Sequence, residues 1–111
     1  MKEINITEWK EIRSSGELAL IEVFSPTCLP CKMLAKELTE LEKVSDIPTF
    51  KIEASILQQA DKELFDQLTG VPSLLLLLQE GRIEVLPRVY ARHQILEQIQ
   101  NYMEGAGNTD V

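Results

Sequence analysis

The most informative segment of the chain is Leu18-Ala19-Leu20-Ile21-Glu22-Val23-Phe24-Ser25-Pro26-Thr27-Cys28-Leu29-Pro30-Cys31-Lys32. Residues 18–24 form a nearly continuous apolar run of strand length, which is typical of a strand covered on both faces, as in a parallel sheet. Residues 25–27 predict a turn. The apolar residues that follow recur at 28, 31, 34, 38, 41 and 44, which predicts a helix with one buried face. A strand, a turn and a helix therefore follow one another, with two cysteines near the start of the helix.

Strands and helices also alternate along the rest of the chain. The further predicted elements are a strand at 4–6, a helix over 7–15, a strand over 49–53, a helix over 55–68, strands over 73–78 and 83–89, and a helix from about 91. Ser55 and Gln58 match a capping box at the start of the third helix. The tight turn at Glu80-Gly81 makes the last two strands antiparallel, and Pro87 confines the second of them to an edge or a bulge.

This order predicts an α/β protein with three layers, α/β/α, around a mixed central sheet. The last helix is expected to bury its apolar residues, namely Ile95, Leu96, Ile99, Tyr102 and Met103. With 111 residues the chain has room for one domain, expected over residues 1–104, with a flexible tail over 105–111.

Composition narrows the classes of function. The chain is 44% hydrophobic and 26% charged, which is ordinary for a globular protein, and its net charge of −7 disfavours nucleic-acid binding. The longest apolar run, Leu74 to Leu78, is far shorter than the ~20 residues of a membrane span. The start of the chain has no apolar run typical of a signal peptide. A cytoplasmic monomer with no membrane contact is therefore the expectation.

Cys28 and Cys31 are the two cysteines, and their position favours chemistry over structural cross-linking. Free N–H groups and the dipole at a helix start favour a thiolate, which lowers a cysteine pKa from about 8.5 to about 3.5–7.5. Cys28 is the expected nucleophile, and Cys31, one turn further on, the resolving thiol. Pro30 suits the first helical turn because it lacks an N–H. Two inert buried cysteines are the plainer alternative. A zinc site is disfavoured because His93 is the remaining candidate ligand and tetrahedral zinc needs four.

Glu22 interrupts the apolar run on the same strand face as Leu20 and Phe24. Burial there would raise the pKa of its carboxyl, which could then exchange a proton with Cys31 during resolution. The alternative is a carboxylate that is solvated or paired with Lys51 on the next strand. Lys51 is accordingly a candidate for tuning the pKa of Glu22. The alternative, that Lys51 is an ordinary surface lysine, is about as consistent with the pattern.

The motif Cys28-Leu29-Pro30-Cys31-Lys32, followed by Val71-Pro72-Ser73, resembles the thioredoxin family. The resemblance covers about residues 3 to 103 and includes the closing hairpin and helix. It implies a thioredoxin fold and a thiol-disulfide oxidoreductase that reduces protein disulfides. It further implies disulfide-containing protein substrates, an external reductase or small-thiol donor, and a part in cell redox homeostasis and electron transport.

Several site residues follow from the resemblance. Glu22 stands where the family usually has a buried aspartate, and Pro72 matches its cis-proline, which faces the dithiol. Val71 would offer main-chain hydrogen bonds to an extended peptide. Leu29 and Pro30 would lie at the rim, and Tyr90 stands near a glycine position where it would narrow or reshape the groove.

Departures from the family pattern keep other functions open. Thr27 replaces the usual tryptophan before the dithiol, and Leu29 the usual glycine within it. A redox-sensing or binding module without turnover and a dithiol metal carrier are the alternatives. Dithiol exchange needs no bound cofactor, so none is expected. The chain also lacks a Gly-x-Gly-x-x-Gly or phosphate-binding loop, so it is not itself expected to be a nicotinamide enzyme.

Overall fold

The computed structural model describes residues 1–88 and 90–107, with side chains through Met103. In chain order its elements are β1 (Lys2–Glu3), α1 (Ile6–Ser15), β2 (Ala19–Phe24), α2 (Leu29–Glu42), β3 (Thr49–Glu53), α3 (Ala54–Ala60), α4 (Lys62–Phe65), β4 (Ser73–Leu77), the 3₁₀ turn η1 (Gln79–Gly81), β5 (Ile83–Val85) and α5 (Arg92–Gly107). The predicted alternation is confirmed.

One mixed sheet carries all strands of the described residues, in the order β1-β3-β2-β4-β5. β1, β3 and β2 run parallel, whereas β4 is antiparallel to both β2 and β5. Because β2 and β4 run in opposite directions, Val23 near the end of β2 lies opposite Ser73 at the start of β4. The residues after β2 and those before β4 therefore meet at one edge of the sheet.

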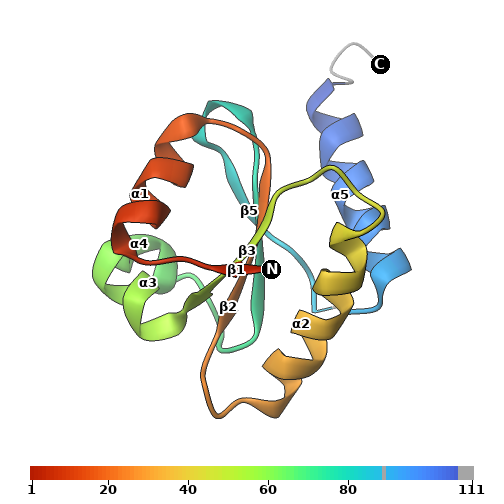
Figure 1. The fold of residues 1–111 in the computed structure, drawn as a ribbon. Coiled ribbons are helices and arrows are strands. Elements are labelled where there is room, and N and C mark those ends of the chain that lie inside the picture. Colours follow the sequence, from red (N-terminus) through yellow and green to blue (C-terminus); the bar gives the residue numbers. More distant parts are fainter. Residues whose placement is uncertain (89, 108–111) are drawn as a thin grey trace.

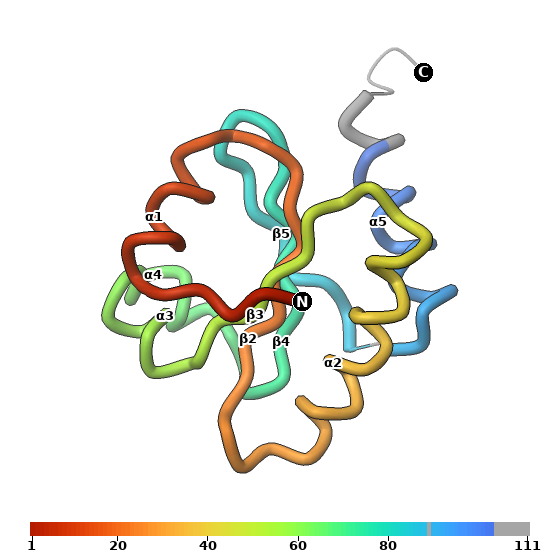
Figure 2. Tube along the Cα trace, viewed as in Figure 1, coloured from red at the N-terminus to blue at the C-terminus, as the bar shows by residue number. Residues whose placement is uncertain are grey.

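Helices cover both faces of this sheet, which confirms the three predicted layers. Figure 1 shows α1, α3 and α4 on one side and α2 and α5 on the other. The same view drawn as a tube shows the sheet nearly edge-on between them (Figure 2). Along β2 the side chains alternate: Ile21 and Val23 belong to the apolar cluster beneath α1 and α3, and Leu20 to the cluster beneath α2 and α5. Glu22 shares the Leu20 side, so it lies on the face covered by α2.

The capping-box prediction is wrong in its position. β3 runs directly into α3, so Ser55 lies inside the first turn and Glu53 at the N-cap makes no side-chain hydrogen bond. The capping box lies instead at α1, where Asn5 Oδ1 accepts from Glu8 N at 2.8 Å and Asn5 N donates to Glu8 Oε1 at 3.0 Å. The opening strand correspondingly ends at Glu3, although Ile4 N still donates to Lys51 O at 2.9 Å.

The single helix predicted over 55–68 is two short helices. Asp61 stands between them with φ −153°, and its carboxylate accepts from Leu64 N at 3.2 Å to cap α4. The same carboxylate pairs with Arg13 of α1 at 3.1 Å. A long-range ion pair thus accompanies a break that the apolar periodicity alone did not predict.

Three residues expected to be buried are exposed. Val44 lies beyond the end of α2 and is 77% exposed, while Leu96 is 36% and Met103 46% exposed on α5. Ile95 and Ile99 are buried as predicted. The apolar periodicity of α5 therefore identified its buried face correctly, but the predicted face also included residues that are exposed.

The last strand and the tail also differ from expectation. β5 ends at Val85, four residues before the predicted end at Val89, which itself lies outside the described residues. β5 is an edge strand, as Pro87 just beyond it indicated. Of the tail expected over 105–111, α5 includes the backbone through Gly107, and residues 108–111 lie outside the described residues.

Candidate active site

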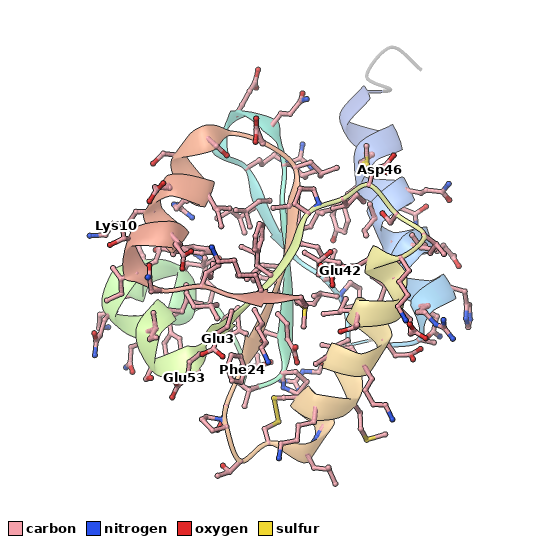
Figure 3. All side chains as sticks on the ribbon, viewed as in Figure 1. Glu3, Lys10, Phe24, Glu42, Asp46 and Glu53 are labelled. Atoms are coloured by element: carbon pink, nitrogen blue, oxygen red, sulfur yellow. A yellow bond between two sulfur atoms is a disulfide. The ribbon has the colours of Figure 1, made fainter. Side chains whose placement is uncertain are left out.

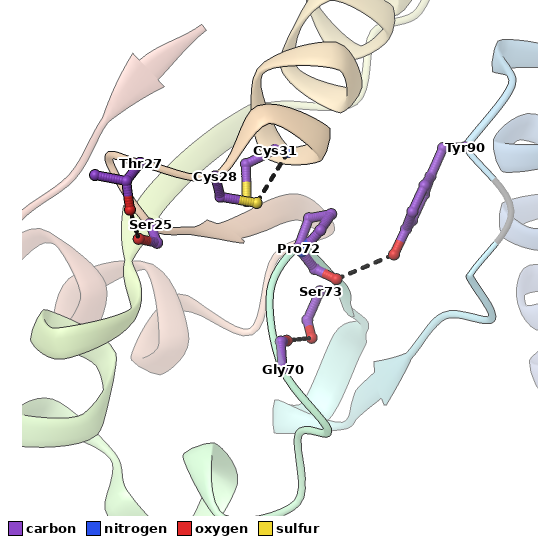
Figure 4. Close-up of a disulfide and its surroundings, with 8 residues drawn as sticks. All are labelled: Ser25, Thr27, Cys28, Cys31, Gly70, Pro72, Ser73 and Tyr90. Carbon is purple, nitrogen blue, oxygen red and sulfur yellow. Dashed lines mark hydrogen bonds between the residues drawn. A yellow bond between two sulfur atoms is a disulfide. The ribbon is translucent and has the colours of Figure 1, made fainter.

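The two cysteines lie at the amino end of α2, as the sequence predicts. Cys28 is the N-cap residue, and its Sγ accepts a hydrogen bond from Cys31 N at 3.2 Å. The Cα atoms of the pair are 5.2 Å apart, and the two sulfur atoms are bonded to each other (Figure 4). Cys28 is half-buried, whereas Cys31 is 2% exposed. Cys28 is thus the more accessible of the two residues.

Local sequence explains why the helix begins here. Pro30 occupies the first turn, where its missing N–H costs no helical hydrogen bond, and Cys28 takes the capping position usually filled by a small polar residue. No acidic residue lies in this first turn. The free N–H groups and the positive end of the helix dipole therefore act on the Cys28 sulfur without an opposing carboxylate in that turn.

The Val71-Pro72 segment approaches the same edge from the other direction. Its peptide bond is cis, and Pro72 directly precedes β4. Because β2 and β4 are neighbours, this segment and the dithiol meet at the edge of the sheet, as Figure 4 shows. Ser73 Oγ donates to Gly70 O at 2.6 Å and closes the preceding loop. The expected cis bond is therefore present, and Figure 4 shows Pro72 beside the disulfide; its role in binding substrate stays a prediction.

Glu22 lies beneath the dithiol and is fully buried, so the solvated alternative is wrong. Neither carboxylate oxygen has a hydrogen-bond partner among the described residues. Burial raises the pKa of this carboxyl to about 7, and the smaller opposing effect is the positive charge of Lys51. Glu22, Cys31 and Lys51 line one small cavity of about 100 Å³.

Lys51 lies next to Glu22 in the sheet but does not pair with it. The two residues are register partners on β3 and β2. Lys51 Nζ instead lies 5.2 Å from the centroid of the Phe24 ring, a cation–π arrangement at the end of β2. Figure 3 labels Phe24 at that end of the strand. The sequence located both residues, but not the contact between lysine and ring.

The remaining predicted residues lie in the first turn of α2 or beside it. Leu29 is 66% exposed at the start of α2, and Pro30 lines a cavity of about 440 Å³. Tyr90 lines the same cavity, together with Met33, which is 63% exposed. Met33 was not singled out from the sequence, although its position four residues after Leu29 places both on one helix face. His93 is exposed, and no cluster of potential metal ligands occurs in the described part of the chain.

Comparison with known proteins establishes the family. A family model described as thioredoxin matches residues 1–104. The chain belongs to the thioredoxin family. Its fold is the thioredoxin fold, and at family level its dithiol is that of a thiol-disulfide oxidoreductase.

Solved structures of thioredoxins superpose over most of the chain. A chloroplastic thioredoxin z has a TM-score of 0.75 at 19% identity, with 95% of each chain covered. The oxidised thioredoxin of Plasmodium falciparum has a TM-score of 0.72 at 20% identity, covering 92% of this chain and 97% of that one. Mitochondrial thioredoxin 3 of Saccharomyces cerevisiae has a TM-score of 0.68 at 20% identity, covering 91% and 94%. At such identities the likeness concerns the fold. Within the described residues no helix is long and apolar enough to span a membrane.

Proposed function

We propose that this protein reduces protein disulfides by dithiol exchange through Cys28 and Cys31. The observation that carries the proposal is the bonded cysteine pair at the amino end of α2, with the Val71-Pro72 segment at the same sheet edge. A thiolate needs a nearby positive potential and access to a substrate sulfur. The helix end supplies the first, and the half-exposed position of Cys28 the second.

The proposed reaction has two exchange steps. The Cys28 thiolate attacks one sulfur of a substrate disulfide; the substrate S–S bond breaks, and the second substrate sulfur leaves as a thiolate that takes up a proton. Cys31 then loses its proton and attacks the Cys28 sulfur of the mixed disulfide, releasing the first substrate sulfur. Two electrons have passed to the substrate, and Cys28 and Cys31 are joined. An external reductase or small thiol reduces them again.

Glu22 is the proposed proton acceptor for Cys31. Both line the cavity of about 100 Å³, and a carboxyl with a pKa of about 7 accepts and returns a proton near neutral pH. Lys51 limits the rise of that pKa through its charge. Glu22 is one methylene longer than the aspartate usual in the family, so its oxygens reach further from the strand.

The proposed substrate contacts lie around Cys28. An extended peptide would pair with the main chain of Val71 beside Pro72, as a short added strand. Leu29, Pro30 and Tyr90 would contact the residues of the peptide next to its cysteine. The partners are thus proteins with accessible disulfides. A cytoplasmic location and a monomeric state stay predictions from the sequence.

Turnover of a protein disulfide tests the proposal. Reduction of insulin by dithiothreitol is measured with the wild type, Cys28→Ser and Cys31→Ser. Catalysis by the wild type alone is expected, because a full cycle needs Cys28 to open the substrate disulfide and Cys31 to resolve the mixed disulfide. Equal inactivity of all three proteins would instead favour a redox-sensing or binding module. Stoichiometric soft-metal binding lost in either variant would favour a metal carrier.

A further inference from the structure

Tyr90 makes a long-range hydrogen bond to the segment that faces the dithiol. Its hydroxyl donates to the Pro72 carbonyl oxygen at 3.0 Å, across 18 positions of the chain (Figure 4). Tyr90 is half-buried, and burial raises the pKa of its hydroxyl. The group is therefore a protonated donor throughout the physiological pH range.

This bond takes the place of a backbone hydrogen bond that β4 and β5 do not make. β4 and β5 pair Leu76 with Glu84, and beyond that register Leu86 N donates to Leu74 O at 2.9 Å. Continued by two residues, the same register would bring the N–H of residue 88 to the Pro72 carbonyl. β5 ends at Val85, however, and the carbonyl receives the Tyr90 hydroxyl instead. The side chain thus completes an interaction that the backbone does not make.

Besides the packing of Val71 against the apolar cluster beneath α1 and α3, two further side-chain hydrogen bonds hold the loop before β4. Ser73 Oγ closes it internally on Gly70, and Arg88 Nη2 donates to Thr69 Oγ1 at 3.3 Å. Both Thr69 and Gly70 are exposed. Of these three bonds, the one from Tyr90 acts directly on the residue beside Val71. Loss of the Tyr90 hydroxyl would therefore free the main chain next to the dithiol while leaving the outer loop contacts in place.

We infer that Tyr90 is a positioning residue for extended peptide substrates: by holding the Pro72 carbonyl, it fixes the Val71-Pro72 main chain in the orientation that a peptide needs for pairing opposite Cys28. The inference rests on the proposed function and adds a substrate distinction to it. Peptide and protein disulfides, which use the Val71 main chain, depend on Tyr90. Small disulfides, which reach the Cys28 sulfur without that pairing, do not. The hydroxyl transfers no proton in either case.

Tyr90→Phe removes the hydroxyl and keeps the ring that lines the cavity. We expect the KM for insulin to rise about threefold to tenfold, the range that corresponds to one neutral hydrogen bond, with kcat within about twofold of wild type. The rate of reduced protein with 2-hydroxyethyl disulfide should stay unchanged. Amide hydrogen exchange at Val71 and Ser73 should quicken. Tyr102→Phe is the matched control, because Tyr102 is a half-buried tyrosine of the cluster beneath α2 and α5.

The outcomes separate this inference from the proposed function. If the wild type reduces insulin and Tyr90→Phe has the same KM for insulin as the wild type, the role of Tyr90 is overturned. The same holds if Tyr90→Phe loses as much rate with 2-hydroxyethyl disulfide as it does with insulin. Unchanged amide exchange in Tyr90→Phe also overturns it. A wild type that does not reduce insulin overturns the proposed function, and the role of Tyr90 in exchange falls with it.

Discussion

Glu22 is a buried carboxyl without a hydrogen-bond partner among the described residues, and this arrangement has a consequence for stability. Burial raises its folded-state pKa from 4.5 to about 7, so the folded protein holds the proton more tightly than the unfolded chain does. The resulting stabilisation is fully present below pH 4.5 and is lost as the pH rises to about 7. The expected loss is about 3 kcal/mol.

Glu22→Gln should remove that pH dependence. The free energy of unfolding of the oxidised wild type and the oxidised variant is measured by urea titration between pH 4 and 8. The difference between the two proteins isolates Glu22 from the other carboxyls, and it should shift in favour of the variant as the pH rises. Curves that stay parallel would contradict the raised pKa.

The same substitution tests the proton transfer. A glutamine cannot accept the Cys31 proton, so release of substrate from the mixed disulfide should slow while formation of the mixed disulfide is preserved. Single-turnover kinetics with a peptide disulfide resolve the two steps. Unchanged release in Glu22→Gln would remove this residue from the mechanism.

The amino end of α2 brings the helix dipole to a cysteine. Because Cys28 is the N-cap and the first turn holds no acidic residue, its thiolate should be stabilised. Alkylation of Cys28 in the Cys31→Ser variant, followed against pH, should give an apparent pKa below about 8. A value at or above about 8.5 would contradict the role of the helix end.

Leu29 offers a direct control on that argument. It is 66% exposed in the first turn of α2, so substitution there costs little packing. In the Cys31→Ser background, Leu29→Glu should raise the apparent pKa of Cys28, because a carboxylate in the first turn repels the thiolate. Leu29→Gln introduces a side chain with the shape of glutamate but no charge, so it should leave the apparent pKa of Cys28 unchanged. Equal effects of the two substitutions would show that the change is not electrostatic.

Two apolar clusters share one sheet, so the domain should unfold as a unit. Leu57 lies in the cluster beneath α1 and α3, and Leu38 in the cluster beneath α2 and α5; both are 0% exposed. Leu57→Ala and Leu38→Ala should each cost about 2–5 kcal/mol in a single transition. Val44→Ala is the control and should change stability by less than about 0.5 kcal/mol, because Val44 is 77% exposed. Two separate transitions would show that the clusters fold independently.

The sequence by itself determined the layers, the order of most elements and the place of the dithiol. These follow from local patterns: the apolar run of β2 and the three-to-four-residue spacing in α2 express which faces are covered, and that information is contained in neighbouring residues. The burial of Glu22 was predictable for the same reason, because strand alternation assigns it to the Leu20 face.

Long-range packing decided the rest. The break at Asp61 goes with an ion pair to Arg13, and the exposure of Leu96 and Met103 depends on how far other elements reach over α5. Lys51 lies over the Phe24 ring, and the Tyr90 hydroxyl bonds to Pro72. Each of these contacts joins residues that are far apart in the chain. The distance between such residues is set only once the sheet has assembled. The apolar periodicity of a helix or strand, or a sequence motif, encodes which face of that element is buried. It does not encode which side chain of another element packs against that face.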